Sequence, residues 1–240
     1  MYSVGVGNTL DSNYRDKIDK FSSHSLIVKE LGRFNLSKNK VLDIGCHTGV
    51  LLSRIRQATD DSNSFYGADL ENNLEKEFGF INFIKCDLNE KELDKVFKNN
   101  SFDVVILADI LEHLVDPWES LLNVKKILNP DAKIVVSLPN SGHWFFRLKV
   151  LFGQIDYKSN GLFDRTHLRF FTKKTAKELI LSGGFAVKKL NYSSLPWENL
   201  LKSRFLTRSL SAVERALILV RPQFFAYQFI FIITSGDDLK

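Results

Sequence analysis

The stretch Val41-Leu42-Asp43-Ile44-Gly45-Cys46-His47-Thr48-Gly49 constrains the fold of this chain more than any other segment. An apolar strand runs directly into an acidic residue and two closely spaced glycines, which predicts a tight turn that presents its backbone to a small charged ligand. Apolar residues then recur at helical spacing, at Leu51, Leu52 and Ile55. The segment therefore predicts a strand, a loop and a helix whose N-terminus faces the ligand.

The spacing of the glycines separates two classes of nucleotide cofactor. A dinucleotide fingerprint, Gly-x-Gly-x-x-Gly, that began at Gly45 would need glycine at the positions held by His47 and Val50. The pattern of a nicotinamide-dependent enzyme therefore fails at two of its three glycines. That class stays as an alternative, which a comparison of ligand affinities can test.

The loop instead resembles motif I of the class I S-adenosylmethionine-dependent methyltransferases, Asp/Glu-x-Gly-x-Gly-x-Gly. Asp43, Gly45 and Gly49 stand on this pattern, and His47 replaces the middle glycine. The resemblance implies that the loop, including Cys46, binds S-adenosyl-L-methionine and releases S-adenosyl-L-homocysteine. A side chain at position 47 must point away from the cofactor or flank it, because only glycine lets the backbone approach more closely.

Alternating apolar strands and helices follow this loop. Strands are predicted at residues 64–69, 81–87, 102–107 and 133–138, and two final strands at the sheet edge at 186–192 and 224–234. With the resemblance, this order predicts an α/β fold with a doubly wound, mostly parallel, seven-stranded, Rossmann-like sheet whose last strand is antiparallel. Acidic residues end four of the strands, so we expect the ligand at their carboxyl ends; they are Asp43, Asp69, Asp87 and Asp109.

The resemblance extends the cofactor site beyond the glycine loop. Asp69 suits a carboxylate that accepts hydrogen bonds from both ribose hydroxyls. The other residues that the resemblance assigns to the cofactor are Leu70, Asp87 and Leu88 toward the adenosine, and Ala108, Asp109 and Ile110 toward the methionine part.

Two later segments carry the candidates for catalysis. Residues 108–117 resemble the segment after the fourth strand of quinone- and small-molecule-type methyltransferases, where a Glu-His pair makes His113 a candidate general base. Residues 161–172 are similar to a bacterial subgroup associated with surface-polysaccharide, lipopolysaccharide and capsule biosynthesis. There Asp164 and His167 are expected to pair and to orient and activate a base. The alternative is that this cluster, including His113, only braces its loops.

Four residues are candidates for contact with the substrate. Arg165 and Arg169 suit a phosphate or carboxylate group. His143 and Trp144 are expected to line a pocket, although aromatic residues there can equally roof the core. No metal site is expected, because the five histidines show no paired spacing and no cysteine pair assists them.

The 240 residues fit a single domain with elaborations. Residues 1–38 are predicted to form an N-terminal helical region, and residues 139–172 and 193–222 to cover the substrate. The late helical region is expected to pack on the sheet as an amphipathic lid through an apolar face. That face comprises Leu200, Leu201, Phe205, Leu210, Val213, Leu217 and Val220.

Composition limits the partners. A charge of +5 without a long basic block argues against nucleic acid. The two cysteines of the sequence, Cys46 and Cys86, form no Cys-x-x-Cys pair, which argues against a disulfide framework. The first residues lack the basic and apolar pattern of a secretory signal, so we expect a cytoplasmic protein. Arginines among the apolar residues of the late helical region allow peripheral association with the inner face of the membrane. A homo-oligomer is compatible with all of this.

The combined prediction is an S-adenosylmethionine-dependent O-methyltransferase that acts on a sugar or sugar-linked precursor in bacterial surface-polysaccharide biosynthesis. Rival acceptors within the same class are a quinone, a lipid precursor or another small metabolite. A second class of function is a non-catalytic cofactor-binding or membrane-surface assembly protein that keeps the fold.

Overall fold

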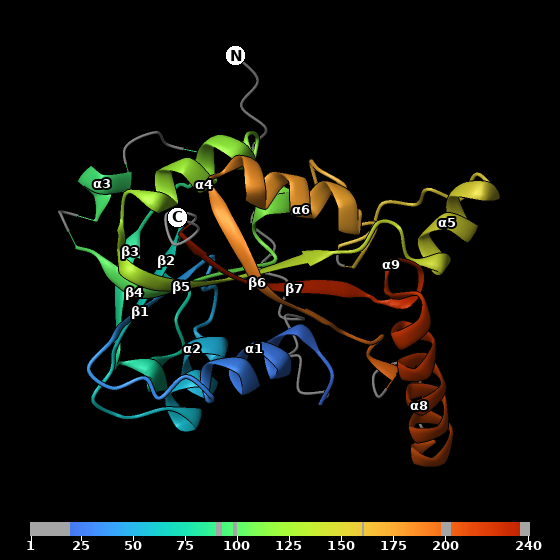
Figure 1. Ribbon diagram of the computed structural model, residues 1–240, viewed down its shortest axis with the longest axis horizontal. Helices are drawn as coiled ribbons and strands as arrows, with labels where there is room; N and C mark the ends of the chain where they lie inside the picture. The colour runs from blue at the N-terminus through green and yellow to red at the C-terminus, as the bar shows by residue number, and fades with distance from the viewer. Residues whose placement is uncertain (1–19, 90–92, 98–99, 160, 198–202, 236–240) are drawn as a thin grey trace.

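The computed structural model describes residues 20–89, 93–97, 100–159, 161–197 and 203–235. Seven strands form one sheet in the order β3-β2-β1-β4-β5-β7-β6, with helices on both faces (Figure 1). β7 runs antiparallel to β5 and β6, and the other neighbouring pairs are parallel. The predicted Rossmann-like sheet with an antiparallel last strand is therefore confirmed. The strands are β1 (Lys40–Ile44), β2 (Ser64–Asp69), β3 (Ile81–Lys85), β4 (Phe102–Ala108), β5 (Leu128–Pro139), β6 (Phe185–Tyr192) and β7 (Gln228–Ser235).

The last two strands differ from the prediction in position. Both are predicted at the sheet edge, but β7 lies between β5 and β6, and only β6 is at the edge. The first six residues of β7 are all buried, whereas β6 carries exposed Lys188 and Lys189. An apolar strand suits the middle of a sheet, and lysines suit an edge. β7 also begins later than predicted, because Pro222 opens the short helix α9 (Pro222–Phe225).

Helices cover the two faces of the sheet separately. α1 (Ser23–Leu31) and α2 (Val50–Ala58) lie on one face, and α3 (Leu93–Val96), α4 (Pro117–Lys125) and α6 (Lys173–Ser182) lie on the other (Figure 1). Val41 of β1 packs into the first layer, and Leu42 and Ile44 pack into the second. A parallel strand buried on both faces reads as a continuous apolar run, which is why β1 is so clear in the sequence. The 3-10 turns are η1 (Lys76–Phe78) and η2 (Leu111–His113).

A third group of helices gathers beyond the carboxyl end of β5. It comprises α5 (Trp144–Leu151), α8 (Arg204–Val220) and α9 (Figure 1). The prediction of a lid packed through its apolar face is wrong for α8, whose buried residues are Thr207, Glu214 and Ile218. The predicted face is exposed from Phe205 to Val220, and its first two residues lie outside the described part of the chain. In the described residues, no helix has the length and apolar character to cross a membrane.

Candidate active site

The glycine-rich loop lies at the carboxyl ends of the central strands, because β1 pairs with β2 on one side and β4 on the other. Gly45 and Gly49 have φ values of 81° and 84°, which glycine adopts without cost. His47 has a φ of 45°, also in the left-handed region. Histidine therefore takes the conformation that glycine would hold freely, at a cost of about 1–2 kcal/mol.

Asp69 joins the end of β2 to this loop. Its Oδ2 accepts a hydrogen bond from the backbone N–H of His47 at 2.9 Å, and its Oδ1 accepts one from Leu70 at 2.7 Å. Each carboxylate oxygen keeps a second lone pair. The carboxylate is thus fixed by the loop and can still accept hydrogen bonds from a ligand's hydroxyl groups.

Asp43 supplies a direct test of whether the loop fits a cationic cofactor. Its side chain is 2% exposed, and Oδ1 has no hydrogen-bond partner in the described structure. Burial, and then the charge of Asp69, raise the pKa of Asp43 well above its usual value. A buried carboxyl oxygen without a partner is costly. The ammonium and sulfonium groups of S-adenosylmethionine are the kind of charge that would offset this cost, so the residues fit the cofactor.

The side chain of Cys46 turns into the protein, where a Cβ on Gly67 would lie 2.7 Å from its Sγ. Burial raises the pKa of the Cys46 thiol, so only its backbone is suited to a cofactor. Ile110 packs closely over Gly45 of the loop. A Cβ atom at position 45 would lie only 3.1 Å from Ile110 Cδ1. After β3, Asp87 accepts hydrogen bonds from Asn89, and Leu88 is buried beside the core, while Leu70 is exposed.

Asp109, which follows Ala108 at the end of β4, is held in a strained conformation. Its φ is 54°, and its Oδ1 accepts hydrogen bonds from Ser137 Oγ and Gln228 Nε2, both at 2.7 Å. These contacts join β4 to β5 and β7 and offset the local strain. Ser137 and Gln228 were not predicted as site residues, because their only signal in the sequence is a polar residue within or beside an apolar strand.

His113 is the best-oriented candidate base. Its Nδ1 lies 3.2 Å from the carbonyl oxygen of Thr166 and 3.0 Å from Thr166 Oγ1. A carbonyl oxygen only accepts, so Nδ1 carries the proton and donates it. The Thr166 hydroxyl donates in turn to Asp164 Oδ1 at 2.6 Å. The neutral ring therefore keeps a lone pair on Nε2, which is the form that a general base needs.

The Asp164 carboxylate accepts a side-chain hydrogen bond from Thr166, which contacts His113, and it acts on His167 through its charge. His167 lies beside Glu112, with its Nε2 3.9 Å from Glu112 Oε1, and its ring meets that of His113 edge-on at 4.7 Å between centroids. Burial, and then the charge of His113, lower the pKa of His167. Thr166 and Glu112 were not predicted as site residues, although they lie within the motifs at residues 161–172 and 108–117.

The four substrate candidates divide into two groups. His143 is fully buried, and its Nδ1 accepts a hydrogen bond from Phe145 N–H at 3.3 Å as the N-cap of α5. The guanidinium of Arg169 donates to the carbonyl oxygens of Leu168 and Val115. Arg165 is exposed and Trp144 is half-buried, so these two stay open to a substrate.

Comparisons with known proteins agree with this arrangement. A family model described as a methyltransferase domain matches residues 13–190. The tRNA U34 carboxymethyltransferase of Sulfurimonas denitrificans is 29% identical over 136 residues, which are 54% of this chain and 42% of that protein. The ubiquinone biosynthesis O-methyltransferase of Rickettsia canadensis is 22% identical over 170 residues, 69% of this chain and 70% of that protein. The chain spans less than half the length of the carboxymethyltransferases that it matches.

Solved structures share the fold. A SAM dependent methyltransferase from Archaeoglobus fulgidus superposes with a TM-score of 0.55 at 22% identity, covering 89% of this chain and 96% of that one. The trans-methyltransferase CalH, in complex with SAH, gives 0.54 at 16% identity, covering 86% and 54%. The family match covers most of the chain and includes the glycine-rich loop, Asp69, Asp109 and His113. The chain therefore belongs to the methyltransferase-domain family, in the class that depends on S-adenosylmethionine.

Proposed function

We propose that the protein transfers a methyl group from S-adenosylmethionine to a hydroxyl group of a sugar or sugar-linked precursor in bacterial surface-polysaccharide biosynthesis. The observation that carries the transfer to oxygen is the orientation of His113 by Thr166 and Asp164. A hydroxyl group is a weak nucleophile until its proton is removed, so an imidazole with a free Nε2 lone pair suits this acceptor.

The chain's own residues divide the work. The cofactor supplies an electrophilic methyl group on sulfur, and transfer needs an in-line approach shielded from water. Asp69 would bind the ribose hydroxyls, and Asp43 would balance the positive charge. His113 would accept the proton of the acceptor hydroxyl at Nε2, and Arg165 would bind an anionic group of the acceptor.

The sugar is favoured by the segment from Asp164 to Thr172, whose residues resemble the polysaccharide-associated subgroup. Two rival acceptors come from the relatives' names. One relative is a ubiquinone biosynthesis O-methyltransferase and another is a tRNA carboxymethyltransferase. A quinol and a tRNA therefore belong in any acceptor panel, beside lipid precursors and other small metabolites.

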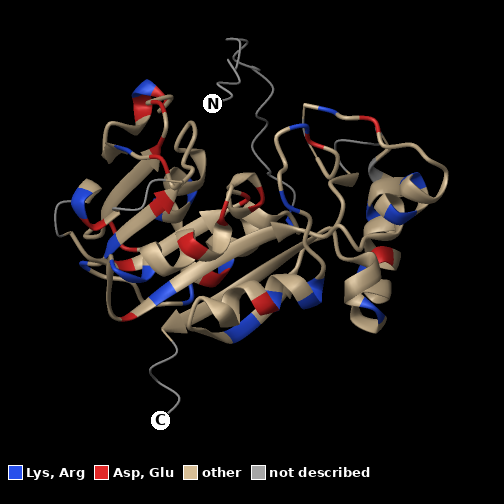
Figure 2. Ribbon diagram, turned by 90° about the horizontal axis from the view of Figure 1, so that it is seen from above, with Lys and Arg blue, Asp and Glu red and all other residues tan. Residues whose placement is uncertain are grey.

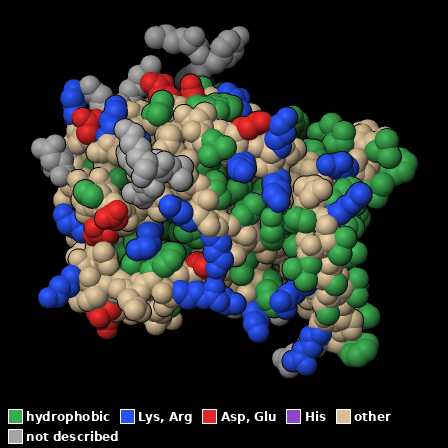
Figure 3. Space-filling model, in the orientation of Figure 1, with side chains coloured by type: hydrophobic (Ala, Val, Ile, Leu, Met, Phe, Trp, Pro, Cys, Tyr) green, Lys and Arg blue, Asp and Glu red, His purple; other side chains and the backbone are tan. Residues whose placement is uncertain are grey.

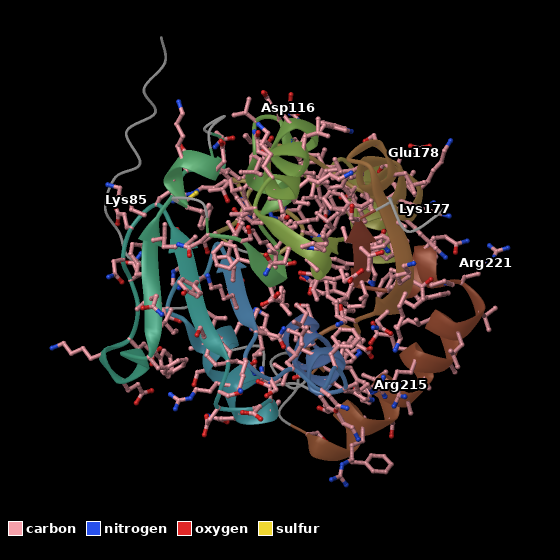
Figure 4. The ribbon with its side chains drawn as sticks, turned by 60° about the vertical axis from the view of Figure 1, so that its left-hand side comes forward. Lys85, Asp116, Lys177, Glu178, Arg215 and Arg221 are labelled. Carbon is pink, nitrogen blue, oxygen red and sulfur yellow. The ribbon has the colours of Figure 1, made fainter. Side chains whose placement is uncertain are left out.

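The test is transfer from methyl-labelled S-adenosylmethionine to nucleotide sugars, glycolipid precursors, quinols and tRNA. We expect label on a sugar hydroxyl, and His113→Gln should lower kcat by about 10²–10⁴-fold while S-adenosylhomocysteine still binds. Glu178→Gln, at an outward side chain of α6 (Figure 4), is the control and should keep wild-type kcat. Label confined to quinol or tRNA would overturn the acceptor, and unchanged turnover in His113→Gln would overturn the base.

We also infer that the protein attaches peripherally to an anionic membrane surface, at the inner face of the cytoplasmic membrane. The attachment surface is the apolar apex, formed by exposed side chains of α5 and α8 that gather with basic groups at one end of the molecule (Figure 3). It comprises Leu148, Leu151, Phe205, Val213, Leu219 and Val220.

Charge favours a lipid surface as the occupant of the apolar apex. Lys149, Arg208, Arg215 and Arg221 lie on or next to α5 and α8. Figure 4 labels Arg215 and Arg221, and Figure 2 shows Lys and Arg on the helices at this end of the molecule. The one acidic residue of these two helices, Glu214, is buried and accepts hydrogen bonds from Trp197 Nε1 and Leu195 N–H. Exposed apolar and basic side chains on a helix favour the interface of a membrane with anionic lipids.

Vesicle co-sedimentation tests the attachment. We expect binding to vesicles that contain phosphatidylglycerol and at least about tenfold weaker binding to pure phosphatidylcholine. Val213→Asp with Leu219→Asp should abolish binding, whereas Leu181→Asp, on α6 and outside the apex, should not. Equal binding by the double variant, or a stable dimer that covers the apex in solution, would overturn the inference.

A further inference from the structure

We propose that Glu112, His113 and His167 form a binding site for one divalent first-row transition-metal ion. One carboxylate oxygen and two imidazole nitrogens from these residues all lie within 4.8 Å of one another. The sequence predicts no metal site, because its histidines show no paired spacing and no cysteine pair assists them. Spacing along the sequence does not decide this, because the fold brings two distant segments together. η2 carries His113, the segment before α6 carries His167, and their rings are in contact.

The distances suit one ion. His167 Nε2 and Glu112 Oε1 are 3.9 Å apart, and the two imidazole rings meet edge-on. Bonds of about 2.0–2.2 Å to a single ion separate its ligand atoms by about 3–4 Å. A small rotation of the side chains therefore brings all three atoms into bonding distance. Two imidazoles and one carboxylate form a donor set that suits zinc, iron, manganese or cobalt as divalent ions.

Hydrogen bonds to backbone groups fix the residues of the cluster. His113 donates from Nδ1 to Thr166, which directs Nε2 away from that contact, and the Leu162 backbone interacts with the ring of His167. The carbonyl oxygen of Glu112 accepts hydrogen bonds from the N–H groups of Leu168 and Arg169 at 2.8 and 3.0 Å. Metal-binding histidines usually carry such a contact at the second ring nitrogen. These contacts hold the three residues next to one another, so only side-chain torsions have to adjust when an ion binds.

The burial of Glu112 is an electrostatic reason to expect a bound cation. The Glu112 side chain is 1% exposed. A buried carboxylate is stabilised by a neighbouring cation, and a divalent ion supplies one. The same Nε2 of His113 cannot hold an ion and accept a proton at once. The metal site and the general-base role therefore describe two different states of the cluster.

The test is metal binding by protein without a polyhistidine tag, after its metals have been removed with a chelator. We expect calorimetric titration with Zn²⁺ to give one ion per chain, and Co²⁺ to produce visible absorption bands. Glu112→Gln and His167→Gln should each weaken Zn²⁺ binding at least about tenfold. Thr166→Val should weaken it up to about tenfold, because it removes the hydroxyl contact of His113 Nδ1 and leaves the contact with the backbone carbonyl oxygen. Glu178→Gln, at an exposed carboxylate of α6 outside the cluster, is the matched control for Glu112→Gln and should leave the affinity unchanged.

Two results would overturn the metal site. One is the lack of saturable binding at one ion per chain, and the other is equal affinity in wild type, Glu112→Gln and His167→Gln. S-adenosylhomocysteine binding, measured on each variant, shows that the variant is folded. If Glu112→Gln does not fold, Thr166→Val and His113→Asn decide the question. Because no acceptor is needed, failure of the metal site is distinguishable from failure of the proposed methyl transfer.

Discussion

Asp43 is the residue whose burial is hardest to explain without a ligand. Its raised pKa means that the folded protein holds the proton more tightly than the unfolded chain does. The free energy of unfolding contributed by Asp43 is thus present at low pH and is lost as the pH rises above about 3.9, the usual value for aspartate. A cationic ligand would reverse this loss, which couples the stability of the loop to cofactor binding.

Asp43→Asn should therefore raise the melting temperature of the ligand-free protein at pH 7, and the gain should shrink toward pH 4 because the wild-type carboxyl then becomes neutral. The same change should weaken S-adenosylmethionine binding, since the loop loses its charge. Thermal unfolding at both pH values and calorimetry measure the two effects. Asp61→Asn, at an 81% exposed side chain, is the control. A destabilised ligand-free Asp43→Asn protein would contradict this account.

His143 gives the protein a second pH dependence, of opposite sign. Burial lowers its pKa to about 4 from an ordinary value near 6.5. Between these pH values, His143 binds a proton in the unfolded chain but not in the folded protein. The free energy of unfolding therefore falls as the pH drops from about 6.5 to about 4. The loss is about 3 kcal/mol over the full window.

His143→Asn should remove this dependence, because asparagine can still cap α5 but does not titrate. Urea unfolding of wild type and variant at pH 7 and pH 4.5 measures it. We expect the wild type to lose about 2–3 kcal/mol more than the variant between the two conditions. Equal losses would show that His143 does not hold its neutral form in the folded protein.

At the scale of elements, two segments far apart in sequence form the candidate catalytic cluster. η2 carries His113, and the segment before α6 carries Asp164 and Thr166. The hydrogen bonds from Leu168 and Arg169 to Glu112 fix one segment on the other. The orientation of the imidazole therefore depends on both.

Thr166→Val should lower kcat about tenfold, because one hydrogen bond of about 1–1.5 kcal/mol that orients His113 is lost. Thr166→Ser keeps the hydroxyl group and should restore most of kcat. The affinity for S-adenosylhomocysteine should be unchanged in both variants, since Asp69 and the glycine-rich loop are untouched. Steady-state kinetics with the acceptor measure kcat. Equal kcat for the valine and serine variants would contradict a role of the Thr166 hydroxyl in orienting His113.

Elements with a local signal were predictable from the sequence. The bounds of β2 match the prediction, and α6 has a local start signal in Thr172, whose side chain accepts a hydrogen bond from Thr175 N–H. α8 was not predictable in the same way, because its apolar residues have helical spacing whether or not they are buried. Its contacts with the rest of the protein run through Thr207, Glu214 and Ile218, which no periodicity singles out.

At the scale of the whole molecule, the order of strands was predictable in class but not in detail. The alternation of strands and helices predicts a doubly wound sheet, whereas the placement of β7 between β5 and β6 depends on which strand buries both of its faces. The position of the candidate cofactor site was predictable, because the acidic residues at the carboxyl ends of β1, β2 and β4 lie at the same edge of a parallel sheet. The hydrogen bonds that join His113, Thr166 and Asp164 depend on contacts between distant segments, which one sequence does not reveal.

Calorimetric titration of the purified protein with S-adenosylhomocysteine and with NAD tests the cofactor assignment most directly. We predict one S-adenosylhomocysteine per chain, no measurable NAD binding, and at least about tenfold weaker S-adenosylhomocysteine binding by Asp69→Asn, which loses charge-assisted hydrogen bonds. Preferential binding of NAD, or no binding of S-adenosylhomocysteine, would contradict the assignment of this loop to a methyltransferase.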